Sequence, residues 1–287
     1  MIPAQNIVAW GAKVPWAEQR QVEQDLIICR AIVALFSDPF LRNELRFRGG
    51  TALNKLHFPG PLRYSEDIDL VRTTRGPIKP VLDRIREALE PWLGKPSFDS
   101  SPVAPKLRFR VPAEGEGGLI RLKVEINVWE IDAFDAPLHL PFKVENPWFT
   151  GEAAVATFSR EEMLATKLRA LLQRDKGRDL YDLGHGLAVF EGLDLARVID
   201  YFGRYLQNSK VKIPRSEAER RMFVKIANPS FLTDMRPLLS APEAAKLDEV
   251  ATKRNFERVF SEFIVRIPGE PWKRTEEMKQ KFDVLRA

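Results

Sequence analysis

Two acidic residues interrupt an apolar strand pattern in the segment Asp67-Ile68-Asp69-Leu70-Val71. In a β-strand, residues i and i+2 point to the same face, so Asp67 and Asp69 share one face while Ile68 and Leu70 enter the core. Two neighbouring carboxylates repel each other, and burying an unpaired carboxylate is costly. A bound divalent cation would offset both costs. Two solvated acids at a strand edge are the alternative.

A third acid, Glu125, lies between aliphatic residues in a later strand pattern. Mg²⁺ prefers carboxylate oxygens together with substrate phosphates, and two metal ions can clamp the oxygens of an in-line phosphoryl transfer. The expected metal ligands are therefore Asp67, Asp69 and Glu125, with Mg²⁺ or Mn²⁺ as the ion. Alternatively, Glu125 pairs with Arg121 or Lys123 on its own face of the strand.

The tripeptide Gly49-Gly50-Thr51 precedes a short helical pattern over 51–57. Glycines let a backbone approach a phosphate closely, and a helix start offers unpaired N–H groups and the positive end of a dipole. Thr51 adds a hydroxyl group. These residues are candidates for binding phosphates, although a simple turn would also explain the two glycines.

The first half of the chain mixes strand and helix patterns, and the second half is helical. Residues at helical or alternating spacing predict helices over 16–36, 51–57 and 78–93, and strands over 45–48, 67–71, 106–111 and 119–129. The segment 113–118 predicts a turn, and the proline-rich segment 136–149 predicts irregular or edge structure. Further helices are predicted over 160–174, 178–190, 194–207, 215–227, 242–265 and 274–285. We therefore expect an α/β (α+β) fold with an N-terminal domain over 1–155 and a helical domain over 156–287.

Composition excludes several classes of protein. No run of eighteen apolar residues occurs in the 287-residue chain, so we expect no transmembrane helix and no membrane partner. The N-terminal segment lacks the pattern of a signal peptide, and Cys29 is the single cysteine, so we expect a cytoplasmic protein. The net charge of +5 and pI near 9.3 favour, mildly, a nucleic-acid partner.

A lysine and two acids in the helical half are further candidates. Lys167 lies at the border of the apolar stripe of the helix predicted over 160–174. It either extends its ammonium group into water or holds that charge towards a cleft. Asp179 and Asp182 share a face of the next helix and either favour its dipole or orient Lys167 or Arg178; the spacing does not choose between the two acids. A basic cluster around them, either an RNA backbone track or a solvated helix face, comprises Arg160, Arg169, Arg174, Lys176 and Arg178.

Taken in order, the strings GGTALNKL and RYSEDIDL, the later strand acid, and the lysine and acids of SREEMLATKLRALLQRDKGRDLYDL resemble a known enzyme family. They are similar to the AbiEii/AbiGii toxins, including the MenT-like toxins, within the polymerase-β-type nucleotidyltransferase superfamily. The resemblance covers about residues 45–190. It implies a nucleotidyltransferase core with a mixed sheet, followed by a helical domain that completes the active-site cleft.

The resemblance also implies an activity and partners. It implies a toxin that transfers a nucleoside monophosphate from an NTP to RNA, with the 3′ acceptor end of tRNA as the expected target, and thereby blocks translation. It implies a cognate antitoxin, in some members a kinase that modifies a residue at the position of Ser65. The alternatives are a transferase acting on a small molecule or a protein side chain, and an idle nucleotide- or RNA-binding protein. The expected catalytic residues are Asp67, Asp69, Glu125, Lys167, Asp179 and Asp182, and the expected phosphate-binding residues are Gly49, Gly50, Thr51, Ser65 and Arg178.

Overall fold

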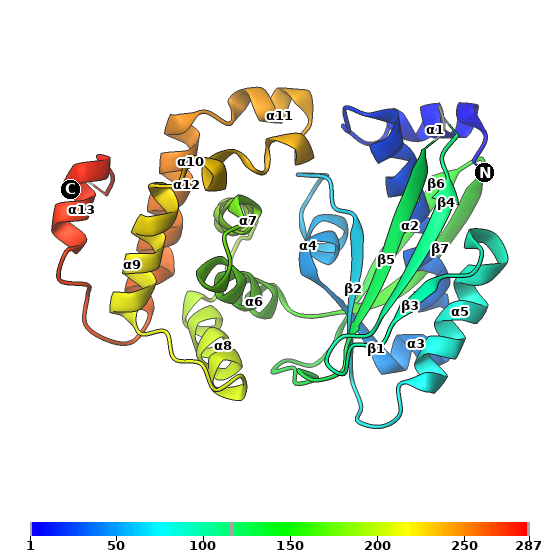
Figure 1. The fold of residues 1–287 in the computed structure, drawn as a ribbon, viewed down its shortest axis with the longest axis horizontal. Coiled ribbons are helices and arrows are strands. Elements are labelled where there is room, and N and C mark those ends of the chain that lie inside the picture. Colours follow the sequence, from blue (N-terminus) through cyan, green and yellow to red (C-terminus); the bar gives the residue numbers. More distant parts are fainter. Residues whose placement is uncertain (1, 115–117, 286–287) are drawn as a thin grey trace. The chain divides into compact units, whose positions relative to one another are not determined.

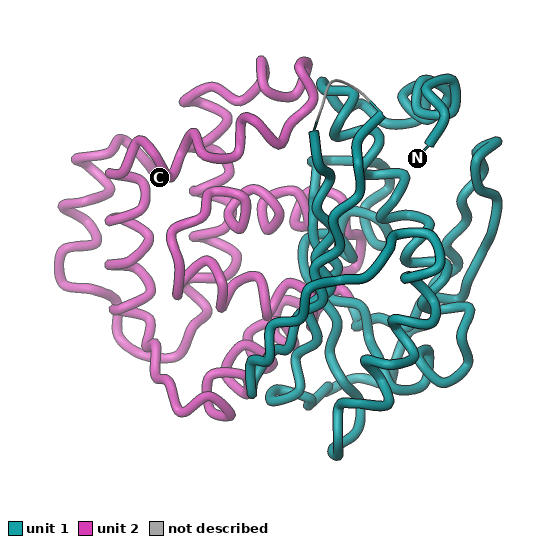
Figure 2. The backbone as a smooth tube through the Cα atoms, turned by 45° about the vertical axis from the view of Figure 1, so that its right-hand side comes forward, with its two compact units in different colours: residues 1–159 teal, residues 160–287 magenta. Residues whose placement is uncertain are grey.

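The computed structural model describes residues 2–114 and 118–285 of the chain. The described residues form two compact units, Met1–Ser159 and Arg160–Ala287, drawn in teal and magenta in Figure 2. The first unit, called the sheet unit here, combines a β-sheet with helices. The second, called the helical unit, consists of helices and turns in its described part.

The sheet unit is built on seven strands in the order β3-β4-β5-β2-β1-β7-β6. Their bounds are β1 (Leu45–Arg48), β2 (Asp67–Arg72), β3 (Ser97–Asp99), β4 (Lys106–Pro112), β5 (Leu119–Asn127), β6 (Leu138–Asn146) and β7 (Phe149–Thr157). The pairs β2–β5 and β1–β7 are parallel, and the other neighbours are antiparallel. The sheet is therefore mixed, as the resemblance implied, and β2 lies at its centre.

Helices cover this sheet unequally. The sheet unit contains α1 (Ala4–Gly11), α2 (Gln19–Ser37), α3 (Pro39–Glu44), α4 (Gly49–Ala52) with its π-helical continuation η1 (Leu53–His57), and α5 (Lys79–Leu93). Figure 1 shows α4 on one side of the sheet and α2, α3 and α5 on the other. The expected α/β fold class is confirmed.

Alternation along β4 and β5 separates the core from a charged face. Leu107 and Phe109 of β4 lie opposite Val124 and Leu122 of β5, and all four side chains are fully buried. Helix α2 contacts β5 and α5 contacts β4 on this side. Each such buried side chain stabilises the fold by about 1.5–3 kcal/mol. The residues between them are polar or charged and point to the opposite side, which we call the charged face.

The helical unit contains eight α-helices and two 3₁₀ turns within residues 160–285. Their bounds are α6 (Arg160–Gln173), α7 (Gly177–Val189), α8 (Leu195–Asn208), α9 (Arg215–Ile226), α10 (Pro229–Thr233), η2 (Arg236–Leu238), α11 (Ala241–Lys246), α12 (Glu249–Glu262), η3 (Ile264–Arg266) and α13 (Thr275–Phe282). Within the described part of the chain, every helix is too short or too polar to cross a membrane.

The structure differs from the sequence predictions in several elements. The proline-rich segment forms the regular edge strand β6, where Pro141 is tolerated because an edge strand need not donate every backbone hydrogen bond. Strands β3 and β7 and helices α1, α3 and α10 were not predicted. The helix predicted over 242–265 is interrupted, because Asp248 caps the start of α12 by accepting a hydrogen bond from the Ala251 N–H. Residues 115–117 of the predicted turn lie outside the described residues.

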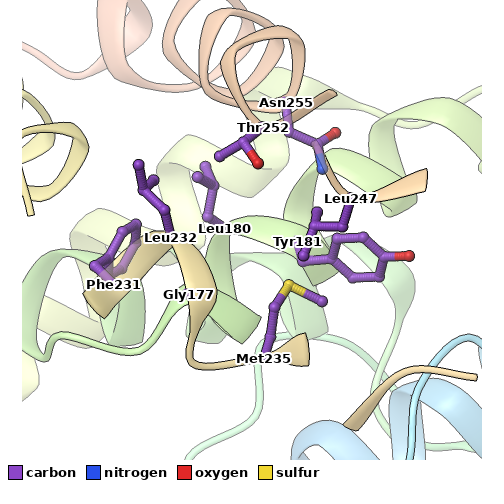
Figure 3. A pocket seen from close by; sticks show the side chains of 9 residues that line it. All are labelled: Gly177, Leu180, Tyr181, Phe231, Leu232, Met235, Leu247, Thr252 and Asn255. Carbon is purple, nitrogen blue, oxygen red and sulfur yellow. The ribbon is translucent and has the colours of Figure 1, made fainter. Parts of the chain in front are cut away.

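Helix α7 begins at a glycine with no room for a side chain. A Cβ atom on Gly177 would overlap the carbonyl oxygen of Phe231 and approach the Asp234 carboxylate, which accepts a hydrogen bond from the Gly177 N–H at 3.0 Å. Figure 3 shows Gly177 and Phe231 among the residues that line a small apolar pocket. The contact with α10 therefore requires glycine here.

We expect Gly177→Ala to lower the free energy of unfolding by about 1–3 kcal/mol, because overpacking forces the backbone of α10 to move. Denaturant unfolding measures this change. Gly203→Ala in α8 is the matched control: a Cβ there meets no atom within 4 Å, and alanine favours the helix. Equal stability of the two variants would contradict the close packing at α7.

Candidate active site

The central strands bring the three predicted metal ligands onto one face of the sheet. The parallel register of β2 and β5 sets Asp69 opposite Glu125 and Asp67 opposite Lys123. Cross-strand neighbours share a face, so the three carboxylates and the lysine lie together on the charged face. On the other side of β2, the antiparallel register sets Arg48 opposite Asp69. The sheet thus assembles these residues from three strands.

Lys123 occupies the space between two of the acids. Its Nζ lies 3.0 Å from Oδ2 of Asp67 and 3.0 Å from Oε2 of Glu125. The alternative prediction, in which Glu125 forms an ion pair with Lys123, is therefore confirmed. Within residues 2–114 and 118–285, no three His, Cys, Asp or Glu side chains form a group that could hold a metal ion.

Asp69 lies in a strongly unfavourable environment for a charge. Burial raises the pKa of its carboxyl group, and the neighbouring Asp67 carboxylate raises it further; Lys123 and Arg48 oppose the shift without cancelling it. Burial would lower the pKa of Lys123, but its hydrogen bonds to Asp67 and Glu125 outweigh burial and raise it. The Asp69 carboxyl group is therefore harder to ionise than an ordinary aspartate.

Two of the three predicted ligands, Asp67 and Asp69, have the donor chemistry of a divalent metal site. Asp67 and Asp69 offer carboxylate oxygens alone, the ligands that Mg²⁺ prefers. The Lys123 ammonium group is a stand-in cation that already binds oxygens of Asp67 and Glu125. A metal ion at these oxygens would have to compete with Lys123.

The predicted phosphate-binding segment, Gly49 to Thr51, contacts β2 directly. Gly49 has φ +82°, and a Cβ on it would overlap Oδ2 of Asp69, so this position requires glycine for two reasons. Thr51 Oγ1 donates a hydrogen bond to the Asp67 carbonyl oxygen and lies 2.8 Å from Ser65 Oγ. The start of α4 and the two acids are consequently held in one local framework.

A buried arginine beside this loop was not predicted from the sequence. Arg63 is only 2% exposed, and a Cβ on Gly50 would overlap its Nη2 atom. Asn54 connects the two segments: its side chain accepts from the Arg63 N–H at 3.2 Å and donates to the Gly50 carbonyl oxygen at 2.8 Å. The only signal in the sequence was an arginine between Leu62 and Tyr64, both of which are buried.

In the helical unit, Lys167 binds both predicted acids. Its Nζ lies 3.1 Å from Oδ1 of Asp179 and 2.8 Å from Oδ2 of Asp182, and both carboxylates are fully buried. The interpretation in which Lys167 extends into water is wrong, because its side chain is only 7% exposed. Arg174 adds two hydrogen bonds to Asp179. Both acids therefore contact the lysine, and a functional role for either of them stays a prediction.

The charge of Asp179 is stabilised by these partners. Burial alone would raise the pKa of its carboxyl group, but the Lys167 ammonium and the Arg174 guanidinium outweigh burial and hold the pKa below its usual range. The cluster is a buried ion network that connects α6 with α7.

The predicted basic cluster does not act as one free patch. Arg174 binds Asp179, Arg160 lies over the ring of Phe190 at 5.1 Å, and Arg169 lies over the ring of Tyr205 at 5.2 Å. Arg178 is half-buried, and its charge lowers the pKa of Asp234 against the effect of burial. Phosphate binding by Arg178 stays a prediction.

The sheet and its row of acids define a nucleotidyltransferase fold. The structure is similar to MenT4, a nucleotidyltransferase toxin from Mycobacterium tuberculosis, with a TM-score of 0.61, 16% identity and all of both chains covered. JHP933 from Helicobacter pylori matches with a TM-score of 0.47 and 16% identity over 93% of this chain and 98% of that one, too weakly to add to the argument. A search of curated proteins found no match.

Residues 30–261 match the model of a family described as the nucleotidyl transferase AbiEii toxin, type IV TA system. The chain belongs to this family of toxin nucleotidyltransferases. The resemblance noted in the sequence is thereby confirmed, and so is the expectation of an enzyme of the nucleotidyltransferase class.

We expect Lys123→Met to raise the affinity for Mn²⁺ in the absence of nucleotide by about tenfold or more. The variant removes a competing cation, and a unit charge a few ångströms away contributes on the order of 1–4 kcal/mol at such sites. Electron paramagnetic resonance of free Mn²⁺ measures the dissociation constant. Lys143→Met is the matched control. Lys143 likewise forms an ion pair with the glutamate two residues later, Glu145, but it lies in β6, at the edge of the sheet and away from the three carboxylates. An unchanged affinity in Lys123→Met would show that the lysine does not compete for the metal.

We expect Lys167→Met to lower the free energy of unfolding at pH 7 by about 3–5 kcal/mol, because it leaves Asp179 and Asp182 buried without their shared cation. The folded-state pKa of Asp179 is depressed, so its stabilisation is present above the unfolded value near 3.9 and is lost as pH falls through the folded value. The gap between wild type and variant should therefore shrink below about pH 4. Urea unfolding between pH 3 and pH 7 tests this, and a constant gap would contradict it.

Proposed function

We propose that this protein transfers a nucleoside monophosphate from an NTP to RNA, with the 3′ acceptor end of tRNA as the target, and thereby blocks translation. One observation carries the proposal: the β2–β5 register sets Asp67, Asp69 and Glu125 on one face of the sheet, and Gly49 at the start of α4 lies against Asp69. Carboxylates beside a glycine-rich helix start suit a metal-bound triphosphate. Membership of a toxin nucleotidyltransferase family supports the reaction class.

Different residues of the sheet unit are proposed to bind the metal ion and the phosphates. Asp67 and Asp69 would hold Mg²⁺, which supplies charge neutralisation at the phosphates when bound. The backbone at Gly49 and Gly50, with the Thr51 hydroxyl group, binds the β- and γ-phosphates. Positioning and electrostatic stabilisation then supply most of the rate.

The transfer itself is an in-line displacement at the α-phosphate. The terminal hydroxyl oxygen of the RNA forms a bond to the α-phosphorus, the bond to the leaving pyrophosphate breaks, and Glu125 accepts the hydroxyl proton. Lys123 holds the Glu125 carboxylate on the charged face. In the helical unit, Lys167, Asp179 and Asp182 stay proposed catalytic residues, and their charges pair with one another in the structure.

The proposal includes a cognate antitoxin, because the family is one of toxin–antitoxin systems. Ser65 is the proposed target where the antitoxin is a kinase. A phosphate there would break the contact between Ser65 and Thr51 and would place negative charge two residues from Asp67. We place these reactions in the cytoplasm, where tRNA and NTP occur together.

The Lys123 contact also favours a second candidate. An ammonium group that binds Asp67 and Glu125 fills a position that metal-dependent catalysis needs. A protein in which this contact persists with nucleotide present would bind NTP or RNA without transferring a nucleotide.

An assay with each labelled NTP, Mg²⁺ and a total tRNA pool tests the proposal. Label on tRNA supports it. Label on a protein or on a small alcohol would instead indicate a different acceptor, and binding without transfer would indicate the second candidate.

We expect Asp69→Asn to lower the transfer rate by more than about a hundredfold. The variant keeps the shape of the side chain but removes a metal-binding charge. Its melting temperature at pH 7 should equal or exceed that of the wild type, because a buried carboxylate beside Asp67 is unfavourable. Wild-type activity in Asp69→Asn would remove the metal assignment, and a lower melting temperature would make Asp69 a structural residue.

A further inference from the structure

On the charged face, the hairpin of β4 and β5 carries a group of basic residues. Its register sets Lys106 opposite Glu125, Arg108 opposite Lys123 and Arg110 opposite Arg121. The positions between them are apolar and mostly buried on the core side. The basic side chains thus belong to the face that carries the three carboxylates.

Two of these cross-strand pairs join like charges. Like charges directly opposite each other destabilise a sheet. Arg108 forms an ion pair with Asp99 of β3, with 3.0 Å between Nη2 and Oδ2. Lys123 forms ion pairs with the acids of the candidate active site. Arg110 and Arg121 differ: both are exposed, and neither forms an ion pair with any residue that the structure describes. Their charges repel each other without a compensating ion pair.

The arginine pair lies in line with the carboxylates. Along β5, Arg121, Lys123 and Glu125 occupy successive positions on one face, and two residues span about 6.5–7 Å of strand. Arg121 is therefore roughly 13 Å along the strand from Glu125. A ligand that contacts both Arg121 and Glu125 must therefore extend along the strand, as the phosphate backbone of a nucleic acid does.

Resting on the proposed function, we propose that Arg110 and Arg121 bind backbone phosphates of the acceptor RNA and guide its 3′ end to Asp67, Asp69 and Glu125. Arginine guanidinium groups bind phosphates through two parallel hydrogen bonds. Between Lys106 and Arg110, and between Arg121 and Glu125, the charged face carries no aromatic side chain on which a base would stack. The contact therefore recognises the RNA backbone without reading its sequence.

The test compares binding of a total tRNA pool by wild type and by the double variant Arg110→Gln/Arg121→Gln. We expect the dissociation constant to rise about tenfold near 0.1 M salt, since two phosphate contacts are lost. The slope of log affinity against log salt should fall in magnitude by about 1.4, that is, about 0.7 for each contact with a single strand. The affinity for NTP should not change, and the melting temperature should stay equal or rise.

Two further double variants serve as controls. Arg84→Gln/Arg86→Gln removes the same charge from α5 on the opposite side of the sheet, and its tRNA binding should match that of the wild type. Arg110→Lys/Arg121→Lys keeps both charges but loses the paired hydrogen bonds, so it should restore the salt slope and only part of the affinity.

The outcomes separate this inference from the proposed function. If the wild type labels tRNA and Arg110→Gln/Arg121→Gln binds tRNA with an unchanged constant and slope, the phosphate assignment is overturned and the transferase function stands. The same holds if the α5 control loses equal affinity, since net charge alone would then explain the loss. If the wild type neither binds nor labels tRNA, the proposed function fails and the inference fails with it. A weaker complex with a purified acidic antitoxin, but not with tRNA, would assign the arginines to that protein instead.

Discussion

The parallel pairing of β2 with β5 is the constraint on which the rest of the candidate site depends. A shift of one residue would send Asp69 into the core and Ile68 out of it, so the apolar residues of both strands fix the register. The same register then fixes which charges meet. Asp69 faces Glu125, and Asp67 faces Lys123, as a direct result of the way the hydrophobic core is built.

Charge is balanced by different means in the two units. In the helical unit, Asp179 and Asp182 are fully buried and share Lys167, so the network is complete within the protein. In the sheet unit, Asp69 keeps a raised pKa in spite of Lys123 and Arg48, which shows that its neighbours do not fully compensate its charge. Complete networks favour stability, whereas incomplete ones are typical of places where a ligand binds.

Sequence reasoning found the elements whose patterns are strong and local. The alternation around Asp67 and Asp69 and the glycines before α4 predicted a strand and a helix start, and both occur. It missed Arg63, because nothing local indicates that a guanidinium group will pack over Gly50 across a loop. It also missed β7, a strand of small and polar residues that pairs with both β6 and β1. The contact of Lys167 with both acids depends on how α6 packs against α7, which helical spacing within one segment does not reveal.

The ammonium group between Asp67 and Glu125 has a consequence for how the chain reaches its native state. Small metal-dependent domains often stay unfolded until the ion arrives, because their ligands repel one another without it. Here a counter-ion is encoded in the polypeptide itself and arrives with β5. The acids of the central strands therefore have a positively charged partner as soon as β5 pairs with β2.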